Sequence, residues 1–221
     1  MKRVLVTAGQ SNLGIAIREK FQKEGFDVYY TVSSPEKIDS DKAISVDLRK
    51  EDEIETAFRK IDHLDVLVNN AGIFTEGKQE SLDTALFDAV YYLNVRGLFL
   101  ISRHFLPLLK KSDGAIVNIS SMNALHPGFG TTGHYDASKG AVSTYTSSLA
   151  SETGPRINAV APGLIYRPAL SGSSLEEYWK SHSVKEEMMD TKEIADAVYF
   201  LAVSKGIYGQ TLLVDNGFCL R

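Results

Sequence analysis

Short apolar runs typical of strands alternate along the chain with segments whose apolar residues recur at helical spacing. Near the start, the run Val4–Val6 precedes Leu13, Ile17 and Phe21, which would share one face of a helix. Similar runs follow at Val28–Val32, Ile44–Val46, Val66–Val68, Ala115–Ile119, Ile157–Val160 and Thr211–Val214. This order of elements predicts βαβ units along the whole chain.

Segments whose apolar residues recur at helical spacing also separate the later strands. The expected helices carry Ile54, Phe58 and Ile61, span about 81–110 and 134–151, and carry Ile194, Val198 and Leu201 before the last strand. Seven strands with almost continuous apolar cores indicate a parallel sheet that is buried on both faces. We therefore expect an α/β fold of the doubly wound type, with residues 1–221 forming a single domain.

Composition narrows the possible partners and surroundings. The 221 residues are 43% hydrophobic, have a formal net charge of −4 and contain no long run of like charge, so neither nucleic acid nor a membrane is an expected partner. Cys219 is the single cysteine, which excludes an internal disulfide framework and a cysteine metal cluster. The chain enters its first strand without a secretory signal pattern, and we expect a cytoplasmic protein.

The most apolar segment, Tyr91–Leu109, is nearly long enough to cross a membrane. It also contains groups that are unfavourable in a helix surrounded by hydrocarbon, namely Asn94, Arg96, Arg103, His104 and Pro107. A buried or interface helix is the better interpretation.

Ligands of doubly wound sheets lie beyond the carboxyl ends of the strands, so residues that directly follow strands are the first candidates for a site. Four such places are Thr7–Gly14, Asn69–Gly72, Ser120–Ser121 and Pro162–Gly163. We expect these four segments to lie around one crevice.

The first of these segments, "TAGQSNLG", matches no common loop motif. Gly9 and Gly14 have the spacing of a P-loop, but the Lys and Ser/Thr that should follow are absent, and Leu13 replaces the last glycine of a nucleophile elbow. The segment does not match G-x-G-x-x-G either. Taken alone, it is consistent with a tight strand-to-helix turn capped by Ser11 or Asn12.

Tyr135 and Lys139 are four residues apart in a predicted helix, so their side chains would share one face. A nearby ammonium group favours the phenolate and lowers the pKa of a tyrosine, which makes the pair a usable general acid and base. Without accompanying motifs, the pair is also consistent with an ordinary surface contact.

Several accompanying motifs are present: "NNAG" at 69–72, "LNVRG" around Asn94, "IVNISS" at 116–121, "INAVAPG" at 157–163 and "GQTLLVDNG" near the end. With Tyr135-x-x-x-Lys139, these motifs cover almost the whole chain, and in this order the sequence resembles the short-chain dehydrogenase/reductase family. The resemblance implies a Rossmann fold and NAD(P)-dependent hydride transfer between a nicotinamide cofactor and a small secondary alcohol or ketone.

In that family the motifs imply a catalytic tetrad, here Asn94, Ser121, Tyr135 and Lys139. Ser121 would bind the substrate oxygen, Tyr135 would exchange its proton, and Lys139 would hold the cofactor ribose and tune the phenol. Asn94 would support a water-mediated proton relay or mend an irregular helix. The implied cofactor-binding residues are Gly9, Ser11, Asn12, Leu13, Gly14, Ser33, Asp47, Asn69, Ala71, Gly72, Tyr135, Lys139, Pro162, Gly163 and Ile165, and no metal is expected.

The catalytic serine departs from the usual family spacing. Ser121 lies fourteen residues before Tyr135, one more than is common, so Ser120 and Ser138 stay as weaker candidates. Arg167 stands where many relatives have threonine, which removes a hydroxyl that could contact the cofactor.

The glycine-rich turn departs as well. The usual Thr-Gly-x-x-x-Gly-x-Gly pattern has Ala8 and Asn12 in place of two glycines. Ala8 adds only a methyl group, and asparagine readily adopts left-handed backbone, so we expect both residues to preserve the turn.

The choice of cofactor depends on the end of the strand Val28–Val32, which lacks the Asp or Glu that would accept the ribose 2′-hydroxyl of NAD. Ser33 and Ser34 occupy that corner, and Lys37 is close enough in sequence to reach a 2′-phosphate. NADP(H) is therefore slightly favoured over NAD(H). Asp47 resembles the adenine-binding aspartate of the family, or it is an acid at a helix N-terminus.

The segment 164–190 would contact the substrate and is expected to form a lid. Its Arg167 is either a partner for a substrate carboxylate or a solvated surface arginine, and the substrate itself is not determined. The alternative function is a catalytically silent dinucleotide-binding sensor, against which the intact Tyr135/Lys139 pair argues. Aromatic and apolar residues in Tyr91–Leu109 and in 134–151 exceed what one face on the sheet requires, so we expect a homo-oligomer, a tetramer or dimer.

Overall fold

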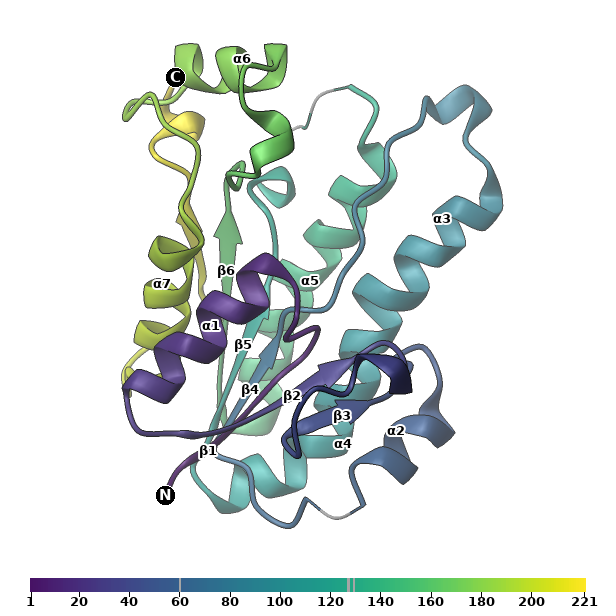
Figure 1. Ribbon diagram of the computed structural model, residues 1–221, viewed down its shortest axis with the longest axis vertical. Coiled ribbons are helices and arrows are strands. Elements are labelled where there is room, and N and C mark those ends of the chain that lie inside the picture. Colours follow the sequence, from purple (N-terminus) through teal and green to yellow (C-terminus); the bar gives the residue numbers. More distant parts are fainter. Residues whose placement is uncertain (60, 127, 129) are drawn as a thin grey trace.

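The computed structural model describes residues 1–59, 61–126, 128 and 130–221, and in these residues seven parallel strands form one sheet (Figure 1). The order is β3-β2-β1-β4-β5-β6-β7. The strands are β1 (Arg3–Val6), β2 (Asp27–Val32), β3 (Ala43–Ser45), β4 (Val66–Asn69), β5 (Ala115–Ile119), β6 (Arg156–Pro162) and β7 (Thr211–Val214). The predicted doubly wound fold is confirmed, and its strand order reverses between β1 and β4, where such sheets bind ligands.

Helices cover both faces of the sheet (Figure 1). One face carries α1 (Asn12–Lys23) and α7 (Thr191–Val203), and the other carries α2 (Glu51–Ala57), α4 (Leu98–Lys111) and α5 (Gly133–Thr153). Successive strand residues serve opposite faces. Val4 and Val6 pack in the core with α1 and α7, whereas Leu5 packs in the core beneath α4. Burial on both sides explains why the strands are continuously apolar.

The helix expected at about 81–110 is divided into three parts. α3 (Thr84–Tyr91) leads through a π-helical turn, Tyr92–Gly97, into α4. Asn94 lies in this wider turn and is buried. A π turn lies within a helix that continues on both sides, so the sequence prediction of one helix at about 81–110 did not distinguish it.

The run Thr84–Lys111 is long and apolar enough to cross a membrane by length and composition alone. The core helix of a globular domain passes the same test. In this fold Ile101, Phe105 and Leu109 of α4 are fully buried against the sheet, which accounts for the apolar composition of that side of the helix.

Candidate active site

A cleft of about 1090 Å³ lies at the carboxyl ends of the central strands. All four strand-following segments selected from the sequence contribute to it. The predicted site residues that line it are Ser11, Asn12, Leu13, Gly72, Ser121, Tyr135, Lys139, Pro162, Gly163 and Ile165. The sheet therefore brings residues from both ends of the chain to one place.

Hydrogen bonds hold the loop after β1 in a tight turn. The Ala8 carbonyl accepts from the Ser11 amide at 3.1 Å and hydroxyl at 2.9 Å, and Asn70 Nδ2 donates to it at 3.2 Å. The Ser11 hydroxyl caps α1 by accepting from the Gly14 amide at 3.0 Å. The loop thus leads directly into a helix N-terminus, whose free N–H groups suit a pyrophosphate.

Ala8, and not Asn12, has the left-handed backbone in this turn. Ala8 has a φ of 50°, whereas Asn12 is the first residue of α1. The expectation that Asn12 would use left-handed backbone is therefore wrong, because the helix already begins at this residue.

Replacing Ala8 by glycine should stabilise the protein. The methyl group makes a left-handed conformation unfavourable, and glycine removes that cost, so we expect Ala8→Gly to raise the free energy of unfolding by about 1 kcal/mol. Urea denaturation followed by circular dichroism measures the change. An unchanged or lower stability would mean that the Ala8 backbone is not strained in solution.

The predicted catalytic pair, Tyr135 and Lys139, lies on α5. Lys139 Nζ is 5.8 Å from the centroid of the Tyr135 ring, and Phe74 packs against that ring with centroids 4.9 Å apart at 80°. Ser121 lies near the Tyr135 hydroxyl, and both residues line the cleft. Proton exchange and oxygen binding can therefore act on the same substrate atom.

The other two serines point elsewhere. The Ser120 hydroxyl bonds the Lys139 carbonyl at 3.0 Å and the Ser143 hydroxyl at 2.8 Å. The Ser138 hydroxyl donates to the Tyr135 carbonyl at 2.7 Å. Ser121 is thus the serine that the structure places beside the phenol, despite its unusual spacing.

Burial controls the ionisation of the pair. Burial raises the pKa of Tyr135, and the nearby Ser121 hydroxyl and the charge of Arg167 act in the opposite direction. Burial also lowers the pKa of Lys139 to about 8, and Nζ donates to the Ile119 carbonyl at 2.8 Å. The expectation of a phenol pKa lowered by Lys139 is not met in this structure, because desolvation dominates.

Lys139 should lower stability at neutral pH. Its folded-state pKa of about 8 lies below the ordinary 10.5, so the unfolded chain binds the proton more tightly. This loss in the free energy of unfolding is nearly full below pH 8 and falls toward zero as the pH rises to 10.5. We expect Lys139→Met to raise the free energy of unfolding at pH 7 by about 2 kcal/mol while weakening cofactor binding and turnover.

Urea denaturation of both proteins at pH 7 and near pH 10 measures the effect, with calorimetry for cofactor affinity. The stability difference should shrink at the higher pH. A Lys139→Met protein that is less stable than wild type at pH 7 would contradict the burial argument, and wild-type cofactor affinity would contradict the ribose contact.

Asn94 holds the loop after β4 beside Lys139. Its Oδ1 accepts from the Ile73 amide at 2.9 Å, and its Nδ2 donates to the Ile73 carbonyl at 3.0 Å and the Ser138 hydroxyl at 3.2 Å. Gly72 lies between the two side chains, since a Cβ there would be 3.2 Å from Asn94 Oδ1 and 3.4 Å from Lys139 Nζ. The part of Asn94 in a proton relay stays a prediction.

Some predicted cofactor residues do not line the cleft. Gly9 and Gly14 shape the loop after β1, and Ala71 ties its amide to the Thr7 hydroxyl at 2.8 Å. Asn69 is buried and donates to Ser102 and Asn118, so its side chain faces the core.

Two further predicted residues lie beyond the cleft. The Asp47 carboxylate is bound by the Arg49 guanidinium at 2.8 Å, which holds its pKa below the usual range. Asp47 is not the N-cap of α2, because that position belongs to Lys50. The Ser33 hydroxyl accepts from Lys37 Nζ at 3.0 Å.

Two residues that position the site were not predicted from the sequence. Asn70, the second asparagine of "NNAG", clamps the loop after β1 and lines the cleft. Asp136, next to Tyr135, accepts from Asn123 Nδ2 at 2.7 Å, the Gly128 amide at 3.0 Å and Thr132 Oγ1 at 3.1 Å. The position of Asp136 inside the Tyr-x-x-x-Lys motif is the sequence feature that could have predicted its role.

The segment expected to form a lid contains a helix that was not predicted, α6 (Ser174–His182). Its Trp179 is fully buried and stacks on Phe218 with centroids 4.4 Å apart, and Trp179 Nε1 donates to the Glu187 carbonyl at 2.8 Å. The segment lines the cleft as a packed cap. Leu175, Tyr178 and Trp179 stand at i, i+3 and i+4, and this spacing is the sequence signal that could have predicted the helix.

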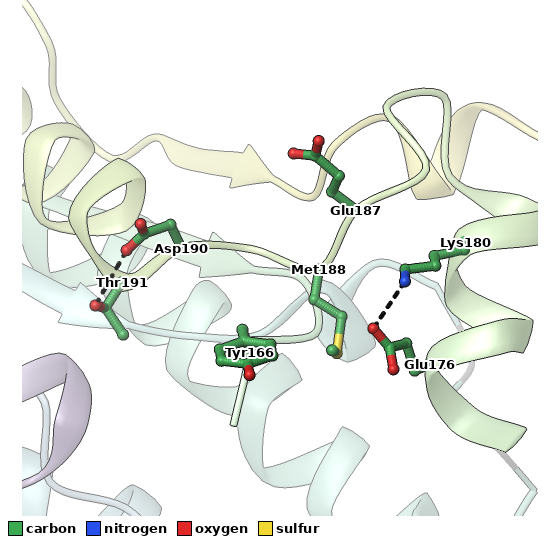
Figure 2. Close-up of a pocket in the computed structure, with 7 residues that line it drawn as sticks. All are labelled: Tyr166, Glu176, Lys180, Glu187, Met188, Asp190 and Thr191. Carbon is green, nitrogen blue, oxygen red and sulfur yellow. Dashed lines mark hydrogen bonds and ion pairs between the residues drawn. The ribbon is translucent and has the colours of Figure 1, made fainter. Parts of the chain in front are cut away.

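A smaller pocket, about 350 Å³, lies beside this segment, between α6 and residues 187–191 (Figure 2). Tyr166 and Met188 point into it, and Lys180 and Glu176 form an ion pair at its edge (Figure 2). It shares no lining residue with the cleft. The larger cleft, which contains Tyr135 and Lys139, is the candidate active site.

Several known proteins are similar to this chain over nearly its whole length. A family model described as enoyl-(acyl carrier protein) reductase matches residues 7–219. A protein of Aquarana catesbeiana, named dehydrogenase/reductase SDR family member 6, is 31% identical, with 99% of this chain and 98% of the relative covered.

Two solved structures are similar in fold. ElxO with NADP bound has a TM-score of 0.89 and 30% identity, covering 100% of this chain and 99% of that chain. The 3-ketoacyl-(acyl-carrier-protein) reductase of Brucella melitensis, complexed with NADH, has a TM-score of 0.88 and 27% identity, covering 98% of each chain.

Proposed function

The chain belongs to the short-chain dehydrogenase/reductase family and is an NAD(P)-dependent oxidoreductase acting on CH–OH or C=O groups, and we propose that it interconverts a small secondary alcohol and its ketone. The observation that carries the proposal is the convergence of Ser121, Tyr135 and Lys139 on one cleft. A phenol, a hydroxyl and an ammonium group provide the proton, the oxygen contact and the charge that this reaction requires.

The loop after β1 fits a dinucleotide. A Cβ on Gly9 would lie 2.4 Å from Tyr30 Cβ, and a Cβ on Gly14 would lie 2.3 Å from the Ala8 carbonyl oxygen, so neither position admits a side chain. The two glycines therefore let the loop pack tightly against Tyr30 and the start of α1, and Ser11, Asn12 and Leu13 at that helix N-terminus line the cleft, where a pyrophosphate would bind. When bound, the nicotinamide group supplies or accepts the hydride.

The side chains of the cleft then transfer the proton. In the reducing direction, Tyr135 donates its phenolic proton to the carbonyl oxygen, and the Ser121 hydroxyl donates a hydrogen bond to the same oxygen. A raised pKa keeps Tyr135 protonated at neutral pH and suits it to act as the acid. Lys139 would bind the ribose hydroxyls and favour the phenolate that is left behind.

NADP(H) is the cofactor that we favour. No carboxylate follows β2 directly, where Ser33 and Ser34 stand, and a carboxylate there would repel a 2′-phosphate. Lys37 Nζ reaches this corner through its 3.0 Å hydrogen bond to the Ser33 hydroxyl, and both residues are at the surface. An ammonium group so placed supports phosphate binding.

A panel of ketones and secondary alcohols, assayed with NADPH and NADH and followed by the absorbance of the reduced nicotinamide, tests the proposal. Turnover of at least one pair with a higher kcat/KM for NADPH is the expected result. Tight dinucleotide binding without turnover across the panel would favour the sensor, and a higher kcat/KM for NADH would reverse the cofactor preference.

We also propose that the protein is a homo-oligomer, most simply a tetramer or dimer. An apolar pocket of about 730 Å³ lies on the outer face of the π turn, α4 and α5, where Tyr92 and Phe99 are exposed. Burying this face between copies removes apolar surface from water. Light scattering at micromolar concentration should give a multiple of the 24.3 kDa chain mass, and a single-chain mass would refute the proposal.

A further inference from the structure

Arg167 is a cationic side chain in the cleft for which the described residues provide no acceptor. It lines the cleft together with Tyr135, Leu170 and Tyr178. Within the described residues it makes no hydrogen bond and no ion pair. The same holds for the side chains of Arg59 and Arg221, but these two arginines lie outside the cleft. A planar guanidinium group with free donors in a ligand cleft is suited to an anion.

The backbone directs Arg167 toward the cleft. Residues 164–166 pair with Met189, through the Tyr166 amide at 2.9 Å and the Met189 amide at 2.8 Å, so this stretch is extended. Successive side chains in an extended chain point to opposite sides. Tyr166 points into the smaller pocket (Figure 2), and Ile165 and Arg167 line the cleft.

The surroundings of Arg167 favour a bound anion with an apolar part. The wall formed by the cap is largely apolar, with Leu164, Leu170, Leu175 and Tyr178. Glu76 is the one carboxylate among the described residues that line the cleft, and no ion pair joins it to Arg167. Arg167 itself is exposed, and the adjoining apolar wall would take up the apolar part of a ligand whose anionic group meets the guanidinium.

The arginine also lies within electrostatic reach of the reacting group, because its charge opposes the rise in the pKa of Tyr135. Both residues line the same cleft, so one substrate molecule bound there would face both of them. The expected place of the cofactor pyrophosphate, in contrast, is the loop after β1.

We propose that Arg167 binds the carboxylate of the substrate, so that the enzyme acts on hydroxy acids and their oxo acids. The inference rests on the proposed function, since it assigns a substrate class to that same cleft. The alternative source of an anion is a phosphate group of the cofactor, and the experiments below separate the two.

The first experiment measures binding without turnover. Butyrate and its neutral analogue butyramide are titrated by calorimetry into the protein saturated with NADP⁺. Wild type should bind butyrate roughly tenfold or more tightly than butyramide, Arg167→Gln should remove the difference, and Arg167→Lys should restore part of it. Arg59→Gln, an exposed arginine outside the cleft, is the matched control and should behave as wild type.

Equal affinity of wild type for the two probes, or an undiminished preference for butyrate in Arg167→Gln, would overturn the inference. A loss of NADP⁺ affinity in Arg167→Gln with no change for butyrate would assign the arginine to the cofactor. Either result is obtained whether or not the protein catalyses a reaction.

The second experiment compares kcat/KM for pyruvate, acetoacetate and levulinate with the values for their methyl esters. A preference for one of the acids over its ester, lost in Arg167→Gln, is expected. Equal turnover of acids and esters would refute the substrate class and leave the proposed function intact. Selective butyrate binding without turnover of any acid or ester would support the carboxylate contact of Arg167 and count against the proposed function.

Discussion

Tyr135→Phe is expected to lower kcat by roughly 100-fold or more while changing dinucleotide affinity little. The substitution deletes the transferable proton, but it keeps the ring that packs edge-on against Phe74. Single-turnover kinetics with a ketone from the panel measure the chemical step, and calorimetry measures cofactor binding.

Tyr145→Phe provides a matched control for this change. Tyr145 is on the same helix, α5, and is partly buried outside the cleft. Its replacement by phenylalanine removes the same hydroxyl group at a position away from the reacting atoms. Its rate should stay near that of wild type. Comparable turnover in Tyr135→Phe and wild type would reject Tyr135 as the proton donor.

Gly14→Val should abolish dinucleotide binding in a folded protein, with an affinity loss of roughly 100-fold or more. Any Cβ at this position would lie 2.3 Å from the Ala8 carbonyl oxygen and 2.9 Å from Gly9 Cα, both backbone atoms. The loop must therefore move out of the shape that would cradle the pyrophosphate. Because Gly14 lies in the first turn of α1, the rest of the helix and its contacts with α7 can persist.

Asn12→Gly changes an exposed residue of the same loop. Asn12 lines the cleft as the first helical residue, and no hydrogen bond of the loop depends on its side chain, so we expect dinucleotide affinity to stay within a few-fold of wild type. Calorimetry measures both variants, and circular dichroism confirms folding. Tight binding by folded Gly14→Val would show that the cofactor does not use this loop, and a large loss in Asn12→Gly would make Asn12 itself a ligand contact.

The local patterns of the sequence determined the fold. Apolar runs for strands buried on both sides and helical spacing between them predicted the parallel sheet with strand boundaries correct to within two residues. Tyr135 and Lys139 also followed from the sequence, because four residues of helix bring their side chains to one face without help from the rest of the chain.

Only the tertiary structure decided the features that depend on contacts between distant segments. Ser121 was separated from Ser120 and Ser138 by the direction in which β5 ends relative to α5, and Asn69 was removed from the cleft by its bonds to Ser102 and Asn118. Spacing along a chain carries no information on which way a side chain points after a strand ends.

The ionisation of the catalytic pair was likewise a tertiary property. The sequence placed an ammonium group beside a phenol and implied a lowered pKa for Tyr135, whereas burial raises that pKa and lowers the pKa of Lys139 to about 8. Desolvation depends on everything packed around a group, and neighbours in sequence supply only a small part of that surrounding. For Arg167, the sequence left a choice between a partner for a substrate carboxylate and a solvated surface arginine, and the tertiary structure places it on the wall of the cleft.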